Sequence, residues 1–160
     1  MAYAKDRLSF WVDGPIKGEG RPRVTMRGTY TPKATREAKA RVRAAALAEM
    51  PEGAPTPLFS GHFAPVAVAI TTWRPLPASR PKAVTHEADT FMPDVDNVAK
   101  LVMDALNGIA WEDDRQVTSL SVTKSARTRL RSEMMLVQVW SDETADVPTE
   151  DGRGEVAADA

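Results

Sequence analysis

Residues 93–117 read PDVDNVAKLVMDALNGIAWEDDRQV, a helical pattern with acidic residues before and after it. Apolar side chains recur every three or four residues, which predicts a helix from about Val95 to Asn107 with one buried face. Asn107-Gly108 is a typical helix end. The apolar stripe comprises Val98, Leu101, Val102, Ala105 and Leu106.

The rest of the chain predicts a small α/β (α+β) domain of order β-α-β-α-β-β, with a mixed sheet and the helices packed on it. Thr31 and Pro32, an N-cap followed by a first-turn proline, begin an alanine-rich helix that runs to about Met50. Alternating or β-branched runs predict the strands, and Gly- and Pro-rich runs predict irregular loops. The expected strands are residues 7–13, 66–73, 116–123 and 134–140, and the expected loops are 14–30, 51–60 and 75–93.

The length and composition of the chain limit the number of domains and the kinds of site that it can have. A chain of 160 residues suffices for one domain with a hydrophobic core. It has no cysteine, which excludes disulfides, thiolate zinc sites and cysteine nucleophiles. It also lacks an apolar run long enough for a membrane span and an N-terminal signal-peptide core, so we expect a soluble cytoplasmic protein without a membrane partner. Residues 141–160 hold seven acids and one base with few large apolar side chains, which predicts a disordered acidic tail after a domain of residues 1–140.

Residues 17–43 are strongly basic, with nine Lys and Arg against two Glu. Arg36, Lys39 and Arg43 share one face of the predicted helix. Such a concentration suggests a polyanionic partner such as nucleic acid, and an ordinary solvated helix face with a basic loop is an equally good explanation. The candidate DNA-binding residues are Lys17, Arg21, Arg23, Arg27, Lys33, Arg36, Lys39 and Arg43.

The acids that flank the helix exceed what helix capping requires. Asp94 is placed to cap the helix and Asp96 to complement its dipole, but Asp113 and Asp114 have no such role before a strand. Two carboxylates about 5 Å apart repel by roughly 3 kcal/mol at an effective dielectric near 20. If the four converge, a bound cation would explain them, and oxygen ligands alone suit Mg²⁺ or Mn²⁺.

Two features beside these acids have competing explanations. Lys100 lies one turn after Asp96, where it either forms an ordinary i,i+4 ion pair or holds a phosphate beside a metal. Asp104, a further turn on, is expected to be a solvated surface charge. An EF-hand that begins at Asp94 is excluded, because Ala99 and Ala105 stand where glycine and glutamate are required.

The run Asp94-x-Asp96-Asn97-x-x-Lys100, followed by Asp104-Ala-Leu-Asn-Gly108 and Asp113-Asp114-x-Gln116-Val117, resembles the signature of the RusA family of Holliday-junction resolvases. The likeness extends more weakly to the first strand, to Arg21-Pro-Arg23 and to Thr29–Lys33, as in phage-type members. It implies a small homodimeric endonuclease, in a bacterial cell, that cuts four-way DNA junctions with Mg²⁺ or Mn²⁺. The implied metal ligands fall on Asp94, Asp96 and Asp114, with Asp113 as an adjacent acid, and the essential lysine falls on Lys100.

The metal-dependent DNA cleavage that the resemblance implies is consistent with the carboxylates found in this sequence. Metal-held carboxylates activate a water and stabilise the leaving oxygen, so no protein nucleophile is needed, and a two-fold dimer supplies the two opposed nicks. Two alternatives remain, a nuclease for other branched DNA such as flaps or forks and a non-catalytic DNA-binding protein. The run His86-Glu87-x-Asp89 is a weaker metal candidate, since a loop histidine is more often solvated.

Overall fold

Strand β8 (Met134–Ser141) joins the two halves of the sheet. In the computed structural model it pairs antiparallel with β1 (Arg7–Asp13) on one side and with β4 (Val66–Trp73) on the other. The far edge of β4 pairs parallel with β6 (Val117–Lys124), which gives the order β1-β8-β4-β6. The expected mixed sheet is therefore confirmed. The structure describes residues 7–61, 64–129 and 132–142.

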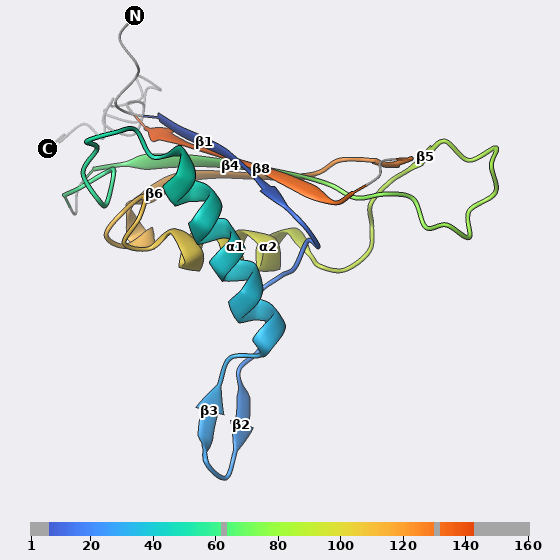
Figure 1. Ribbon diagram of the computed structural model, residues 1–160, viewed down its shortest axis with the longest axis horizontal. Coiled ribbons are helices and arrows are strands. Elements are labelled where there is room, and N and C mark those ends of the chain that lie inside the picture. Colours follow the sequence, from blue (N-terminus) through green and yellow to red (C-terminus); the bar gives the residue numbers. More distant parts are fainter. Residues whose placement is uncertain (1–6, 62–63, 130–131, 143–160) are drawn as a thin grey trace, which may run out of the picture.

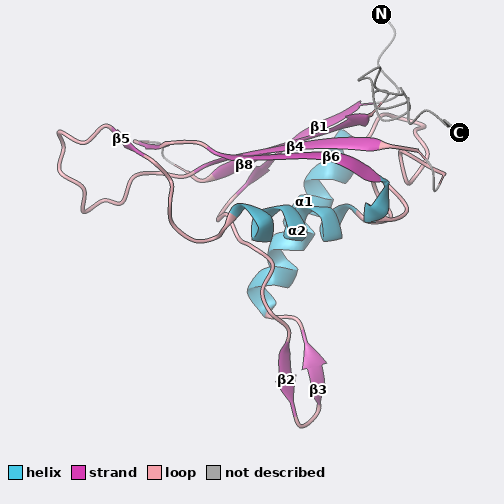
Figure 2. Ribbon diagram, turned by 180° about the vertical axis from the view of Figure 1, so that it is seen from behind, coloured by secondary structure: helices cyan, strands magenta, loops and turns pink. Residues whose placement is uncertain are grey.

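Two helices cover one face of this sheet (Figures 1 and 2). Helix α2 (Val95–Leu106) buries all five residues of its predicted apolar stripe. Helix α1 (Lys33–Glu49) buries smaller residues, among them Ala38, Val42 and Ala46. Each fully buried Val or Leu contributes roughly 1.5–3 kcal/mol. The core between sheet and helices thus fixes α2 along its whole length.

The chain leaves α2 through a buried turn. Gly108 has a positive φ of 79°, as the predicted helix end requires. Trp111 is fully buried, and its indole N–H donates to the Asn107 side-chain oxygen at 2.8 Å. A 3₁₀ turn, η1 (Asp114–Gln116), then leads directly into β6. The buried indole therefore fixes the direction in which the chain approaches Asp114.

The basic segment differs from its prediction. We expected residues 14–30 to be irregular, but β2 (Arg23–Thr25) and β3 (Gly28–Tyr30) form an antiparallel hairpin that projects from the body (Figure 1). Its tight turn uses Gly28 at a φ of 123°. The Thr25 hydroxyl lies 3.0 Å from the Gly28 carbonyl oxygen, to which it donates. Glycines and prolines before the hairpin concealed this short β-branched run from pattern analysis.

Other boundaries needed smaller corrections. Pro32 rather than Thr31 occupies the N-cap position of α1, with no side-chain capping hydrogen bond. The expected loop 75–93 contains β5 (His86–Glu87), which pairs with β7 (Arg127–Thr128). Strand β8 runs to Ser141 and Asp142 is buried, so the described fold passes the expected boundary at residue 140. The rest of the expected tail, 143–160, lies outside the described residues.

Within the described part of the chain, none of the helices has the length and apolar character that crossing a membrane requires.

Replacing Trp111 by alanine tests whether the buried indole holds this turn. We expect the free energy of unfolding to fall by about 3–5 kcal/mol, because a large cavity opens in the core. Leu47→Ala is the control, since the Leu47 side chain lies on α1 and is 51% exposed. Urea denaturation measures both variants, and similar small changes in the two would show that Trp111 is not part of the core.

Candidate metal and nucleic-acid site

Helix capping does not explain the acids at the start of α2. Asp94 occupies the N-cap position in an extended conformation, but its side chain makes no capping hydrogen bond. Asp94 and Asp96 are both exposed, and neither forms an ion pair with any described residue. The i,i+4 pair of Asp96 with Lys100 is also absent among the described contacts. Both carboxylates and the Lys100 ammonium therefore remain available to a ligand.

Asp113 and Asp114 have different roles. The Asp113 carboxylate accepts a hydrogen bond from the Arg115 backbone N–H at 2.9 Å and pairs with the Arg115 guanidinium at 3.0 Å. Hydrogen bonds from the Arg115 side chain and backbone lower the pKa of Asp113 to about 2. These contacts use Asp113 inside the turn. Asp114, the first residue of η1, is left half-exposed beyond it.

Gln116, which the sequence analysis did not select, locks this turn to the body. Its side-chain oxygen accepts from the backbone N–H groups of Glu112 and Asp113, which completes a capping box. Its amide nitrogen donates to the carbonyls of Phe59 and Ala64 at 3.1 and 3.2 Å. Gln116 is buried with all its polar atoms engaged. The position of Asp114 is thus set by a satisfied polar network.

The structure brings three of the predicted site residues to one depression. Asp96, Lys100 and Asp114 line an open cavity of about 380 Å³. Asp104, which we expected to be a solvated surface charge, lines it as well. Asp94 and Asp113 are not among the lining residues. Ala99, Met103 and Leu120 form the apolar part of the wall.

The oxygen donors around this depression meet the requirements of Mg²⁺ binding. No group of three or more Asp, Glu or His side chains within the described ranges is arranged to hold a metal ion. Mg²⁺ rarely needs such a cage, because it keeps several waters and binds through one or two carboxylates together with substrate phosphates. Asp96 and Asp114 across one depression fit that requirement. The carboxylates would hold such an ion jointly with a phosphate ligand.

Two of the predicted DNA-binding residues are used inside the protein. Lys39 pairs with Glu19 at 2.9 Å and with Asp104 at 3.4 Å. Arg43 donates to the carbonyl oxygens of Ala105 and Asn107 at the C-terminal end of α2. Helical spacing placed Lys39 and Arg43 on one face correctly, but that face partly packs on α2.

The other basic residues of the predicted set are exposed, and Lys33 pairs only loosely with Glu37 at 3.6 Å. They are Lys17, Arg21, Arg23, Arg27, Lys33 and Arg36.

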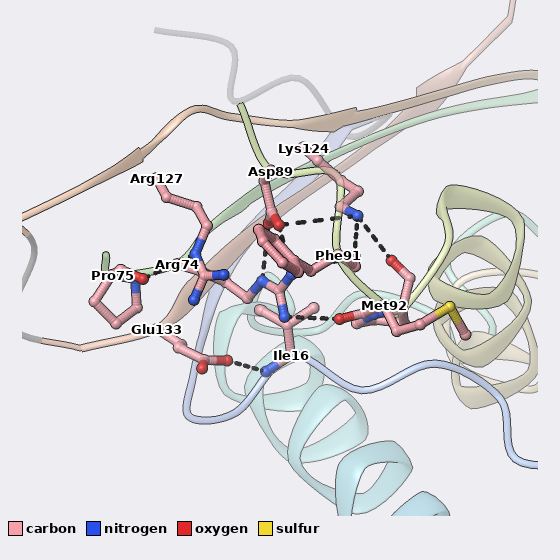
Figure 3. A network of polar contacts seen from close by, with 10 residues as sticks. Ile16, Arg74, Pro75, Asp89, Phe91, Met92, Lys124, Arg127 and Glu133 are labelled. Atoms are coloured by element: carbon pink, nitrogen blue, oxygen red, sulfur yellow. Dashed lines mark hydrogen bonds and ion pairs between the residues drawn. The ribbon is translucent and has the colours of Figure 1, made fainter. Parts of the chain in front are cut away.

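A buried ion pair anchors the approach to Asp94 (Figure 3). The Arg74 guanidinium binds Asp89 through two hydrogen bonds of 2.5 and 2.8 Å and also donates to the Met92 carbonyl at 2.8 Å. Lys124 donates to the carbonyls of Phe91 and Pro93. Arg74 and Lys124 thus hold the three carbonyls that directly precede Asp94. We call Arg74, Asp89 and Lys124 the loop clamp.

The loop clamp also rules out the weaker metal candidate. Burial alone would raise the pKa of Asp89, but the hydrogen bonds and charge of Arg74 outweigh it and lower that pKa. The same contacts raise the pKa of Arg74. His86 contacts the Thr85 hydroxyl, and Glu87 pairs with Arg80. Sequence patterns gave no signal for the clamp, because its members come from three separate segments.

Asp89→Asn tests the clamp through stability. At pH 7 we expect a loss of about 3–5 kcal/mol, because the variant leaves the Arg74 charge buried without its partner. The lowered pKa of folded Asp89 means that its stabilisation is present above its ordinary pKa of 3.8 and is lost as the pH falls below it. The variant should therefore show a flatter dependence of stability on pH below about 4. Urea melts from pH 2 to 7 measure this.

Glu87→Gln is the matched control, because it breaks the more exposed pair with Arg80. We expect that change to cost at most about 1 kcal/mol at pH 7. Equal losses in the two variants would contradict a special role for Asp89.

Known proteins resemble this chain over most of its length. Residues 13–137 match the family model described as Endodeoxyribonuclease RusA. The chain is also 32% identical over 146 residues to the uncharacterized protein YqaN of Bacillus subtilis (strain 168), an alignment that covers 84% of this chain and 98% of YqaN. The matched residues include the whole of α2, the η1 turn and the loop clamp. The chain belongs to the RusA family of endodeoxyribonucleases.

Proposed function

We propose that this protein is a divalent-metal-dependent endonuclease that resolves four-way DNA junctions by paired nicks. Family membership supports hydrolysis of the DNA backbone. One observation carries the proposal further. Asp96, Lys100 and Asp114 line the same depression, although Asp96 lies in the first turn of α2 and Asp114 lies beyond its C-terminal end. Two carboxylates and an ammonium group, with no cysteine in the chain, suit phosphodiester hydrolysis with a hard metal ion.

Asp96 and Asp114, with Asp94 as the N-cap residue two positions before Asp96, would hold Mg²⁺ or Mn²⁺, which supplies Lewis-acid stabilisation of the leaving oxygen and a more acidic water. Lys100 offers a cation to the non-bridging oxygens of the phosphate. The Asp113–Arg115 contacts and Gln116 keep Asp114 oriented. The loop clamp fixes the backbone before Asp94. These residues prepare the geometry before the DNA arrives.

The exposed basic residues would hold the DNA backbone. They lie in the segment before α1 and in the first turn of α1, which Figure 1 shows next to the hairpin. Contacts of Lys and Arg with phosphates release counterions, so binding should weaken steeply with salt and carry little sequence information. Lys39 and Arg43 are left out of this surface because their charges are engaged with α2.

A homodimer would supply the two nicks. Helices cover only one face of the sheet (Figure 2), and the other face carries Trp11, Trp73, Leu136 and Trp140. The rings of Trp11 and Trp73 lie 5.3 Å apart, yet Trp11 remains 53% exposed and Trp140 36% exposed. A sheet face of this kind normally packs on another layer, and a second copy related by a two-fold axis would provide one.

Two other functions use parts of the same surface. A nuclease for flaps or forks would need the same carboxylates and differ only in the DNA that it fits. A non-catalytic DNA-binding protein would use the basic residues, but carboxylates near phosphates weaken binding when no cation is present. The acids beside Lys100 therefore favour a nuclease.

Asp96→Asn is the direct test of the metal site. Cleavage of a synthetic four-way junction in Mg²⁺ should fall by more than roughly 100-fold, since loss of even an outer partner of a metal ligand costs about 10–100-fold. Junction binding should persist, because the variant removes one negative charge from the DNA-binding face. Gel assays of cleavage and binding measure both quantities, with flap and fork substrates run in parallel.

Asp104→Asn is the matched control, because Asp104 lies on the same helix, lines the same depression and pairs with Lys39. We expect its cleavage rate to stay within about ten-fold of wild type. Normal cleavage by Asp96→Asn would remove the metal-site assignment. Failure of wild type to cut any substrate in Mg²⁺ or Mn²⁺ would favour the non-catalytic binder, and faster cutting of flaps or forks would favour the other nuclease.

Trp11→Glu tests the dimer. A charge on the open sheet face, at edge strand β1, should raise the dimer dissociation constant by roughly 30-fold or more, since a buried tryptophan anchor is worth about 2 kcal/mol or more. Leu47→Glu, an exposed position on α1, is the control and should leave the mass unchanged. Light scattering across a dilution series gives the answer, and a monomeric wild type would contradict this proposal.

A further inference from the structure

The β2–β3 hairpin has no role in the hydrophobic core. All its residues, 23–30, which we call the arm, are exposed, and the arm projects away from sheet and helices (Figures 1 and 2). Its apolar side chains are also exposed, with Val24 at 80%, Met26 at 105% and Tyr30 at 47%. An isolated two-stranded hairpin is only marginally stable in water. Because Val24 and Met26 are so exposed, burial within the fold does not explain why these two side chains are apolar.

The charge around the arm indicates an anionic partner. Residues 20–36 contain five basic side chains and no acidic one. Within that range, Arg23 and Arg27 flank the apolar residues Val24 and Met26. Arginine beside an exposed Met, Leu or Phe is the combination by which proteins hold phosphates and insert an apolar side chain between base steps. The arm therefore fits DNA better than it fits an apolar protein surface.

The base of the arm is tied to the helix that carries Asp96. The Glu19 backbone N–H donates to the Asn97 carbonyl at 2.9 Å, and Asn97 is the residue after Asp96. The Gly20 N–H donates to the buried Thr35 hydroxyl at 3.2 Å. The Glu19 side chain pairs with Lys39, which also pairs with Asp104. Arm, α1 and α2 are thus held together at one place.

Gly18 shows how closely the two parts approach. A methyl group added there would lie 2.8 Å from the Cβ atom of Asn97 and 3.0 Å from that of Pro93. No side chain fits at such distances without displacing the start of α2. The arm therefore has a fixed base beside the candidate metal site and a free tip.

We propose that the arm reads the branch of the DNA substrate, with Met26 inserted where base stacking is interrupted and Arg23 and Arg27 on the adjoining phosphates. This role of the arm rests on the proposed function, because it takes branched DNA as the substrate. Inserting a side chain into continuous duplex costs unstacking energy, and a branch point has already lost part of that stacking. The arm therefore supplies preference for branched over linear DNA without reading sequence.

The length of the arm limits where the cut falls. From Gly20 to Met26 the chain spans at most ~20 Å at about 3.3 Å per residue. That length corresponds to roughly six base pairs at about 3.4 Å per step. With the base fixed beside Asp96, the scissile phosphate should lie within about six base pairs of the branch.

Met26→Ala tests the proposal on the full chain. The probe is a synthetic four-way junction with 2-aminopurine at the branch, compared with a linear duplex of the same arm sequence, in EDTA so that no cutting occurs. Wild type should raise the 2-aminopurine fluorescence of the junction. In Met26→Ala this rise should be lost and the ratio of junction to duplex affinity should fall roughly five-fold or more, because the variant removes the apolar side chain that inserts between the bases.

Two control variants separate insertion from charge. Met26→Leu keeps an apolar tip and should keep the fluorescence rise. Arg27→Gln removes a phosphate contact and should weaken junction and duplex binding alike, with a smaller salt dependence. Because Met26 is fully exposed, Met26→Ala should melt like wild type.

Several results would overturn the proposal. They are an unchanged fluorescence rise and affinity ratio in Met26→Ala, no rise with wild type, or a shift of Met26→Ala from dimer to monomer in light scattering, which would place the tip against a second copy. A fluorescence rise in wild type without cleavage in Mg²⁺ would support the arm and contradict the nuclease. Absence of binding to either DNA would contradict both.

Discussion

Burial of one face of α2 is the constraint on which the site depends. The apolar stripe seats the helix on the sheet, so both of its ends have fixed positions. At the N-terminal end this places Asp96 and Lys100, and at the C-terminal end the buried Trp111 and Gln116 turn the chain back toward them. Asp114 then lines the same depression. The helix acts as a rigid spacer that its buried apolar face aligns on the sheet, and the charged residues Arg74, Lys124 and Lys39 hold the segments around it.

The carboxylates around the depression divide into engaged and available groups. Asp113 is paired with Arg115, and Asp104 with Lys39, so the charge of each is compensated within the protein. Asp94 and Asp96 have no such partner among the described residues. Ionised carboxylates on neighbouring positions repel each other, and a bound cation would compensate that repulsion. The available group, Asp94 and Asp96, contains two of the three carboxylates that we propose as metal ligands.

Local pattern was sufficient where one segment determines its own structure. The stripe of α2, the β-branched run of β4 and the acids at 94, 96 and 114 were all readable, because periodicity and residue type are local properties. The loop clamp was not, since Arg74, Asp89 and Lys124 meet only after the sheet has formed. The contacts of Lys39 and Arg43 with other parts of the chain could not be predicted for a related reason. Helical spacing identifies a shared face, but only the packed structure shows that α2 occupies part of it.

The charged residues beside the site fall into two groups, those that position a segment of the backbone and those that stay exposed. Arg74 pairs with Asp89, and its other N–H groups donate to the carbonyls of Met92 and Phe91. Arg74 therefore fixes the backbone before Asp94, and its charge does not face the depression. Lys39 similarly links Glu19 at the base of the arm to Asp104 on α2. Buried Arg74 thus holds the loop that leads to α2, and half-buried Lys39 holds the base of the arm against α2, with the charge of each compensated by a carboxylate. The exposed cations of Lys100, of the arm and of Lys17, Arg21, Lys33 and Arg36 are the ones that we propose to bind phosphate, which separates positioning charges from binding charges within one small domain.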